Sequence, residues 1–368
     1  MHVGMSPIFQ NPYNARPDSE VYREEVRLAD MAEGLGFDSI WAIEHHFTDY
    51  TMCPDPVQFL TYMAGRTSKA LLGTSVIVLP WHDPMRVAEQ ISMLDNLSGG
   101  RMILGLGRGL GRVEYDGFRI PMAEGRERFV EYAELLLAGL ENGYLEGGET
   151  VRQPRRDIRP LPVKSFRGRT YAAAVSPESM PIMAKLGVGL LVIPQKPWEV
   201  VRQDLAIYRD VYVRSNHCEP PPPFCGGFYF VDEDPVRAEE LGMQYIGEYY
   251  HTAMKHYEMA DQQFGKDKGY EFYRNVSKYI GRHGQEGAAR DFAQLMPWGT
   301  PKQVLEKIEY IHEILGMNAI SCNFSYAGMP WAEAERNMKC FAKHVLPELH
   351  KWKTQPFGEA PELELRVA

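Results

Sequence analysis

Eight short apolar runs alternate along this chain with amphipathic stretches of helical length, and this alternation restricts the fold more than any other feature. Such alternation is typical of repeated βα units around a parallel sheet. The predicted strands are residues 2–9, 39–43, 71–79, 102–106, 171–175, 189–193, 224–231 and 319–324. The predicted helices are residues 19–35, 84–97, 126–142, 177–186, 198–215, 235–260, 301–315 and 331–350. Eight units predict closure into a (β/α)8 TIM barrel with insertions.

The 368 residues fit one elaborated barrel, so residues 1–352 are expected to form a single domain. A glycine follows three of the predicted helices, where a left-handed cap is expected: Gly36, Gly187 and Gly316. Residues 144–168 and 264–296 exceed ordinary connections and are predicted to be insertions, functional or mobile. Residues 353–368 show no period and are expected to be a loose tail or a partner-binding arm.

Composition excludes several classes of function. The formal net charge of −9 is spread along the chain without a basic stripe, which argues against nucleic-acid binding. The five cysteines form no CxxC pair, so neither a zinc site nor a disulfide framework is predicted. A signal peptide and an 18-residue apolar run are both missing, so no membrane association is expected and a cytoplasmic location is predicted.

The run Glu44-His45-His46 follows the second predicted strand, at the end of the barrel where catalytic residues collect. Adjacent residues of an extended chain point to opposite faces, so His45 and His46 are not expected to share one metal ion. One imidazole is expected to face the cavity and the other the rim. A metal pair or a histidine satisfied within the core remains the alternative. No metal site is predicted.

Residues 105–111 carry a glycine at every second position and do not fit the dinucleotide fingerprint GxGxxG. Alternate glycines permit close approach of a planar or phosphorylated ligand, and Arg108 offers a guanidinium fork for phosphate; a plain flexible loop is the alternative. Ser176 and Ser179 flank a predicted helix start, a place that accepts phosphate, although capping alone also explains them. With Arg126 these side chains are expected to converge on one terminal phosphate.

Motifs along most of the chain resemble the bacterial luciferase superfamily of flavin-dependent monooxygenases, and the luciferase alpha subunit in particular. The order and spacing of the motifs make the resemblance specific. They are Gly36-Phe37-Asp38, Trp41 with residues 44–48, Gly73-Thr74 with residues 77–80, Leu94-Asp95 with residues 98–101, Arg108-Gly109-Leu110, Lys268-Gly269-Tyr270 and Gly299-Thr300-Pro301.

The resemblance implies roles for individual residues. It makes His45 the catalytic histidine beside the flavin ring and Glu44 its acidic neighbour. It implies a non-proline cis peptide between Ser75 and Val76 under the flavin, and a mobile active-site lid over residues 264–296 after the seventh strand. The residues that it places at the phosphate of FMN are Arg108, Arg126, Ser176 and Ser179.

The resemblance further implies a two-component reaction. FMNH2 supplied by a separate NAD(P)H:flavin reductase would react with O2 through a C4a-hydroperoxyflavin, with His45 moving a proton. The expected substrate is a small apolar compound such as a terpene, alkane, ketone or aldehyde, and a homodimer is expected. The residues predicted to line its pocket are Phe47, Tyr50, Met52, Trp81, Tyr270 and Phe272.

Two departures argue against light emission, because luciferase has a cysteine where this chain has Gly107 and an acid where it has Val175. Three alternatives stay open. They are an oxidoreductase that uses the deazaflavin F420, a flavin-binding protein without catalysis, and a metal-dependent barrel hydrolase, which the absence of converging ligand spacing disfavours.

Overall fold

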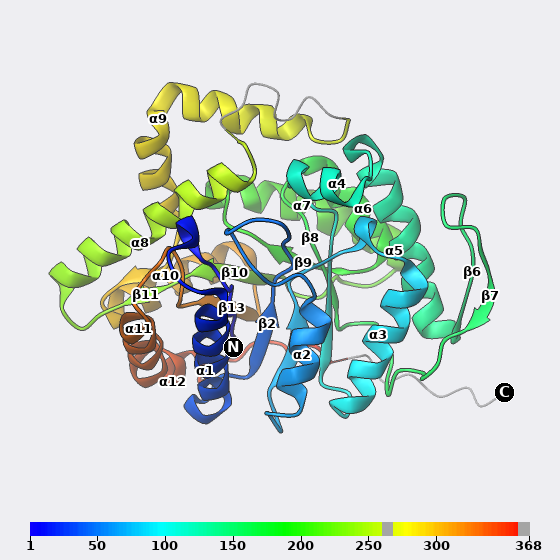
Figure 1. The fold of residues 1–368 in the computed structure, drawn as a ribbon, viewed down its shortest axis with the longest axis horizontal. Coiled ribbons are helices and arrows are strands. Elements are labelled where there is room, and N and C mark those ends of the chain that lie inside the picture. Colours follow the sequence, from blue (N-terminus) through cyan, green and yellow to red (C-terminus); the bar gives the residue numbers. More distant parts are fainter. Residues whose placement is uncertain (260–267, 360–368) are drawn as a thin grey trace.

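Eight parallel strands close into a barrel, as the sequence predicts (Figure 1). The computed structural model describes residues 1–259 and 268–359. The ring closes because β3 pairs with both β2 and β5, while β1 pairs with β2 and β13. The barrel strands are β1 (His2–Met5), β2 (Ser39–Ala42), β3 (Leu71–Thr74), β5 (Met102–Gly107), β8 (Thr170–Ala173), β9 (Gly189–Val192), β10 (Phe224–Phe228) and β13 (Ala319–Asn323).

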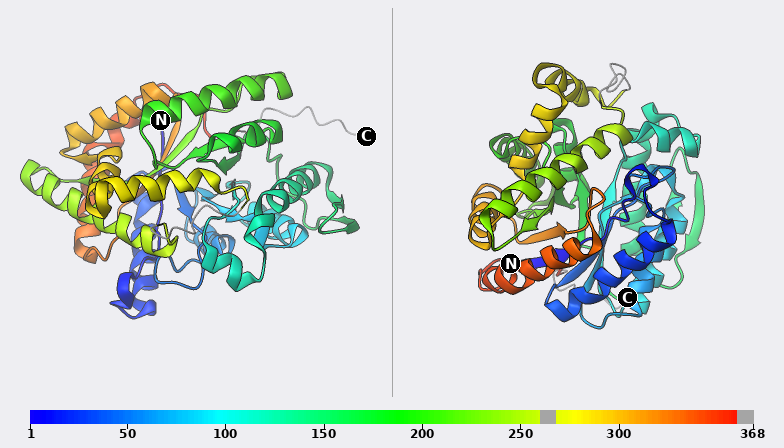
Figure 2. Two further views of the ribbon diagram at one scale, coloured as in Figure 1. Left: turned by 90° about the horizontal axis from the view of Figure 1, so that it is seen from above. Right: turned by 60° about the vertical axis from the view of Figure 1, so that its left-hand side comes forward.

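Helices surround the barrel (Figure 2). They are α1 (Asp18–Leu35), α2 (Pro56–Ala64), α3 (Pro84–Leu97), α4 (Arg112–Phe118), α5 (Gly125–Asn142), α6 (Met180–Leu186), α7 (Trp198–Asn216), α8 (Pro235–His256), α9 (Arg274–Leu295), α10 (Pro301–Leu315), α11 (Trp331–His344) and α12 (Leu346–Leu349). Gly36, Gly187 and Gly316 have φ of 97°, 70° and 64°, which confirms the three predicted left-handed caps. Among the described residues no helix has the length and apolar character needed to cross a membrane.

Two predicted strands are each divided in the structure. Residues 71–79 become β3 and β4 (Ile77–Val78), separated by the Ser75–Val76 peptide, which is cis as the resemblance implies. Residues 224–231 become β10 and β11 (Phe230–Val231), and β11 pairs with β12 (Trp298–Gly299) outside the barrel. The insertion at 144–168 holds a hairpin of β6 (Tyr144–Gly147) and β7 (Gln153–Asp157), which projects from the barrel in Figure 1.

The expectation of a loop over residues 264–296 is wrong for most of that segment, because residues 274–295 form helix α9. Residues 264–267 lie outside the described part of the chain. Helix α9 bends at Gly284, where φ is 73°, and after the bend its buried residues Ala289 and Ala293 lie four positions apart, on one helix face. Three glycines within the helix hide this period from a reading of propensity alone. Helix α9 lies with α8 at the top of the barrel in Figure 1.

Aromatic rings fill the amino-terminal end of the barrel. The Trp41 ring stacks on Phe224, with centroids 4.2 Å apart, and fits because a Cβ at Gly4 or Gly73 would lie within 2.4 Å of it. Phe357 closes this end: it is 7% exposed and stacks on Tyr171 at 5.1 Å. The expectation of a loose tail is therefore wrong for residues 354–359, while residues 360–368 lie outside the described chain.

The alternate glycines of β5 make room for the neighbouring strand. A Cβ at Gly105 would lie 1.9 Å from the carbonyl oxygen of Thr74, and one at Gly107 would lie 2.3 Å from Val76. Gly109, with φ of 81°, would place a Cβ 2.7 Å from Val78. The alternate glycines do permit another group to approach β5 closely. That group is the chain itself around the Ser75–Val76 peptide.

Candidate active site

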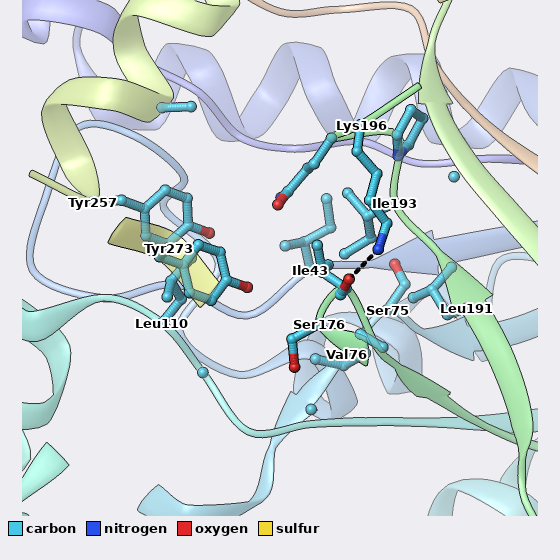
Figure 3. A pocket seen from close by; sticks show the side chains of 18 of the residues that line it. Ile43, Ser75, Val76, Leu110, Ser176, Leu191, Ile193, Lys196, Tyr257 and Tyr273 are labelled. Carbon is cyan, nitrogen blue, oxygen red and sulfur yellow. Dashed lines mark hydrogen bonds between the residues drawn. The ribbon is translucent and has the colours of Figure 1, made fainter. Parts of the chain in front are cut away.

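A cavity of about 500 Å³ lies at the carboxyl ends of the barrel strands, beneath α8 and α9. This volume falls within the range of about 300–1,000 Å³ that is usual for small-molecule and cofactor sites. Five strands supply a lining residue directly after their last position: Ser6, Ile43, Ser75, Arg108 and Ile193. Ser176, three positions after the end of β8, lines the cavity as well. Figure 3 shows Tyr257 and Tyr273 on one side of the cavity and Ile193 and Lys196 on the other.

His45 lies on the wall of this cavity and is held from two sides. Its Nδ1 is 2.9 Å from Oε1 of Glu114, which lies in the first turn of α4 and also accepts the backbone N–H of His46 at 2.9 Å. Its Nε2 is 3.2 Å from the hydroxyl of Tyr257. Burial alone would raise the pKa of Glu114, but the charge and hydrogen bond of His45, together with the nearby imidazole of His256, lower it to about 2.

These contacts define the proton positions on His45. Glu114 is ionised at neutral pH and only accepts, so His45 Nδ1 carries the hydrogen that it donates. Burial raises the pKa of the Tyr257 phenol well above its usual value, so the phenol keeps its proton. In the neutral imidazole, Nε2 is then the basic nitrogen, and it accepts from Tyr257. A ring oriented in this way can take up and return a proton at the cavity.

Glu44 accepts hydrogen bonds from His46 and His82, which corrects its expected place beside His45. Its Oε1 accepts hydrogen bonds from His46 Nε2 at 2.9 Å and His82 Nε2 at 2.6 Å, and its Oε2 accepts the backbone N–H of Val78 at 2.7 Å. His45 and His46 do point in different directions, as the extended chain requires. Glu114, the carboxylate that contacts His45, was missed because α4 was not predicted.

His256, in the last turn of α8, brings a second imidazole to Glu114. Its Nε2 lies 3.6 Å from Glu114 Oε1 and its Nδ1 lies 2.9 Å from Thr48 Oγ1. Its ring stacks on Tyr50 with centroids 4.5 Å apart. Burial lowers the pKa of His256. The sequence carries no signal for this residue, because it lies more than 200 positions from the run that contains His45.

The four predicted phosphate-binding side chains all line the cavity. Ser176 and Ser179 lie with their hydroxyl oxygens 2.9 Å apart. Arg108 Nη1 and Arg126 Nη2 donate to one acceptor, the carbonyl oxygen of Gly269, at 2.7 and 3.0 Å. The guanidinium of Arg108 also lies 3.9 Å from the ring centroid of Tyr270. Two cationic groups therefore converge on one oxygen at this wall of the cavity.

Comparison with known proteins decides the family. Residues 1–317 match the luciferase-like monooxygenase family. The chain belongs to this family. It is 27% identical over 340 residues to the alkanal monooxygenase alpha chain of Photorhabdus luminescens, covering 90% of this chain and 92% of that protein.

Solved structures of luciferase-like enzymes have the same barrel. Monooxygenase RslO1 from Streptomyces bottropensis is 26% identical, with a TM-score of 0.76 and coverage of 95% of this chain and 99% of that one. The oxygenating constituent of 3,6-diketocamphane monooxygenase from Pseudomonas putida, solved with FMN, is 17% identical, with a TM-score of 0.72 over the same shares. F420-dependent enzymes share the fold as well.

Three of the six predicted substrate-pocket residues line the cavity: Tyr50, Trp81 and Phe272. The other three lie elsewhere, which corrects the prediction. Phe47 is 61% exposed, and Met52 packs against the barrel core. Tyr270 is buried beneath Arg108, where its hydroxyl contacts Gly109 and Tyr115. Proximity along the sequence to the histidine run did not determine which aromatic side chains face the cavity.

The cavity of this luciferase-like chain fits a flavin mononucleotide. Two of its lining residues each carry a buried polar atom that has no hydrogen-bond partner among the described residues, the donor Trp81 Nε1 and the acceptor Asn323 Oδ1. The edge of a flavin ring offers both acceptors and a donor. Ser75 and Val76 line the same cavity, and the arginines and serines occupy its cationic wall. No sequence motif points to Asn323.

Proposed function

We propose that the chain is a two-component monooxygenase that uses FMNH2 and O2 to add one oxygen atom to a small organic substrate. The observation that carries this proposal is His45, held between Glu114 and Tyr257 on the wall of the cavity that also holds four candidate phosphate ligands. Membership of the luciferase-like monooxygenase family supports it.

The residues that would hold FMN fall into two groups. Arg108, Arg126, Ser176 and Ser179 bind the phosphate, since guanidinium groups and hydroxyls are strong phosphate ligands. Ser75 and Val76 would support the ring, and Asn323, whose Oδ1 has no partner among the described residues, would offer it an acceptor. Reduced flavin, when bound, supplies the electrons that activate O2.

The protein's own part in the reaction centres on His45. Its Nε2 takes up or returns a proton at the reacting face of the cavity, while Glu114 stabilises the imidazolium that forms. Tyr257 keeps the ring oriented through its hydrogen bond to Nε2. Helices α8 and α9 cover the cavity and exclude water from it.

The substrate would occupy the part of the cavity under α8 and α9. Its walls there are mostly apolar and aromatic, including Tyr250, Met254, Phe272 and Phe292. Side chains of this kind bind through apolar contact area and ring stacking. They suit the terpene, alkane, ketone or aldehyde that the resemblance implies. A separate NAD(P)H:flavin reductase and a homodimeric state complete the proposal.

The proposal is tested with purified protein, FMN, a flavin reductase and NADH, by screening apolar compounds for products heavier by one oxygen atom. His45→Ala is expected to lower product formation by about 100-fold or more, the usual contribution of a positioned acid or base. Oxygen uptake should continue, with hydrogen peroxide released instead. The matched control is His251→Ala, because His251 lies outside the cavity lining.

Two results would contradict the proposal. If His45→Ala keeps wild-type coupling of oxygen uptake to product, His45 has only a structural part. If reduced F420 supports hydride transfer without oxygen while FMNH2 is inactive, the deazaflavin alternative is correct.

A further inference from the structure

We propose that His45, Glu114 and His256 form a binding site for a divalent transition-metal ion, with Zn²⁺ as the preferred ion. One ring nitrogen of each histidine and one carboxylate oxygen of Glu114 lie within 4.8 Å of one another. The site is distinct from the phosphate wall of the cavity. It lies at the junction of β2, α4 and α8, three elements that are distant in sequence.

The distances suit a small ion. Ligand atoms around a tetrahedral Zn²⁺ at its usual bond lengths lie about 3.3–3.5 Å apart. The two measured separations bracket this value, with Glu114 Oε1 at 2.9 Å from His45 Nδ1 and at 3.6 Å from His256 Nε2. An ion placed here replaces the proton that His45 Nδ1 donates to Glu114. The third separation, between the two imidazole nitrogens, is within 4.8 Å.

Two orphaned atoms point to a missing ligand at this place. The side chain of His256 is 1% exposed, and its Nε2 has no hydrogen-bond partner among the described residues. Glu114 Oε2 is likewise buried without a partner in that part of the chain. Buried polar groups are almost always satisfied, so an atom that accepts from neither chain nor solvent needs an explanation. A bound cation supplies the acceptors with a partner.

Outer contacts prepare His256 as a ligand. Its Nδ1 lies 2.9 Å from Thr48 Oγ1, so Nδ1 can donate to the hydroxyl and leave the lone pair of Nε2 free. Metal-binding histidines usually donate their second nitrogen in this manner. On the other side, Tyr257 contacts His45 Nε2 at 3.2 Å, which keeps that nitrogen engaged and Nδ1 toward Glu114.

The ligand set selects the class of ion. Two imidazoles and one carboxylate favour Zn²⁺, Co²⁺, Ni²⁺ or Cu²⁺ over Mg²⁺ and Ca²⁺, which prefer oxygen ligands. Three protein ligands leave an open position for water, and the cavity that His45 and Glu114 line gives an ion a path to the site. The sequence gives no sign of this ligand set, because Glu114 and His256 lie far from His45 along the chain and approach it only in the fold.

Binding of the ion has a consequence for the reaction proposed above. His45 cannot accept a proton freely while it and Glu114 hold a cation. Zn²⁺ is therefore expected to inhibit oxygenation. This consequence rests on the proposed function, whereas metal binding itself does not.

The test uses the flavin-free protein and Co²⁺ as the probe, followed by competition with Zn²⁺. The wild type is expected to bind one Co²⁺ per chain, with visible absorption bands of a low-symmetry nitrogen and oxygen site, and Zn²⁺ should abolish them. His256→Ala should weaken binding by more than about 100-fold, since loss of an outer contact alone costs about 10- to 100-fold. His251→Ala, on the same helix, should bind as the wild type does.

A second variant guards against misfolding of His256→Ala. Thr48→Val keeps all three ligands and should weaken Co²⁺ binding by about 10- to 100-fold. Equal affinity in wild type, His256→Ala and Thr48→Val, or no visible bands in the wild type, would overturn the proposal. A different result would separate the two proposals. If Zn²⁺ binds and this binding depends on His256, but product formation does not fall, the metal site is supported and the role proposed for His45 is contradicted.

Discussion

Arg126→Gln tests the proposal that this wall of the cavity binds phosphate. Arg126 donates to the carbonyl of Gly269 at 3.0 Å, so a bound phosphate would replace one acceptor with another. Hydrogen bonds that involve a charged group contribute about 1.5–3 kcal/mol. A phosphate contact at the upper end of this range, set against a carbonyl contact at the lower end, leaves a net loss of about 1.5 kcal/mol in the variant. This corresponds to about a tenfold rise in the Kd for FMN.

The assay is an anaerobic titration with FMNH2 and with reduced riboflavin, which has no phosphate. The Kd for riboflavin should change by less than about twofold, because the ring contacts remain. Arg128→Gln is the matched control: Arg128 lies two positions further along α5 and pairs with Glu124 at 3.0 Å, outside the cavity lining. An equal loss for both flavins in Arg126→Gln would refute the assignment of this wall to phosphate.

Three further predictions concern the scaffold. Burial raises the pKa of Glu25 to about 8 from 4.5, so between these pH values the unfolded chain holds fewer protons than the folded chain. The free energy of unfolding should therefore fall by up to about 1.4 kcal/mol for each unit that the pH rises. Glu25→Gln should reduce this dependence when urea unfolding is compared at pH 5.5 and 7.5. Phe357→Ala should lower the free energy of unfolding by about 3 kcal/mol or more, measured by the same urea unfolding. An unchanged free energy of unfolding would show that the ring does not stabilise the amino-terminal end of the barrel. Gly105→Ala should prevent stable folding, since the new Cβ would lie 1.9 Å from a carbonyl oxygen, whereas Gly226→Ala, with 3.9 Å to its nearest neighbour, should fold and melt as the wild type does.

The barrel could be predicted because its signal is local and repeated. Each strand is a short apolar run, and three of the αβ turns carry a left-handed glycine cap, such as Gly316 after α10. Helix α9 could not be predicted from the same rules, since Gly281, Gly284 and Gly287 lower its helix propensity. Its stability comes from packing against α8, a tertiary contact that propensity does not contain.

The candidate site could be predicted in part. The run of residues 44–46 points to the site because it follows a strand, and strand ends meet at one face of a barrel. The resemblance to the luciferase superfamily then implies that His45 is the catalytic histidine and Glu44 its acidic neighbour, whereas in the structure Glu114 is the carboxylate that contacts His45. Glu114 and His256 reach His45 only through the closure of the fold, which brings α4 and α8 over the end of β2.

Two buried carboxylates lie near residues 44–46, and they differ in whether they are available for chemistry. Glu44 and Glu114 each face two histidines, and their ion pairs and hydrogen bonds lower the pKa of both against the effect of burial. Glu44 has donors on both oxygens, from His46, His82 and the backbone of Val78. Three of the roughly four acceptor sites of this carboxylate are therefore filled by the protein, which fixes the chain around it. Glu114 keeps Oε2 without a donor in the described chain and lies beside an imidazole on the cavity wall, so the same pairing there leaves capacity for a proton or a metal ion.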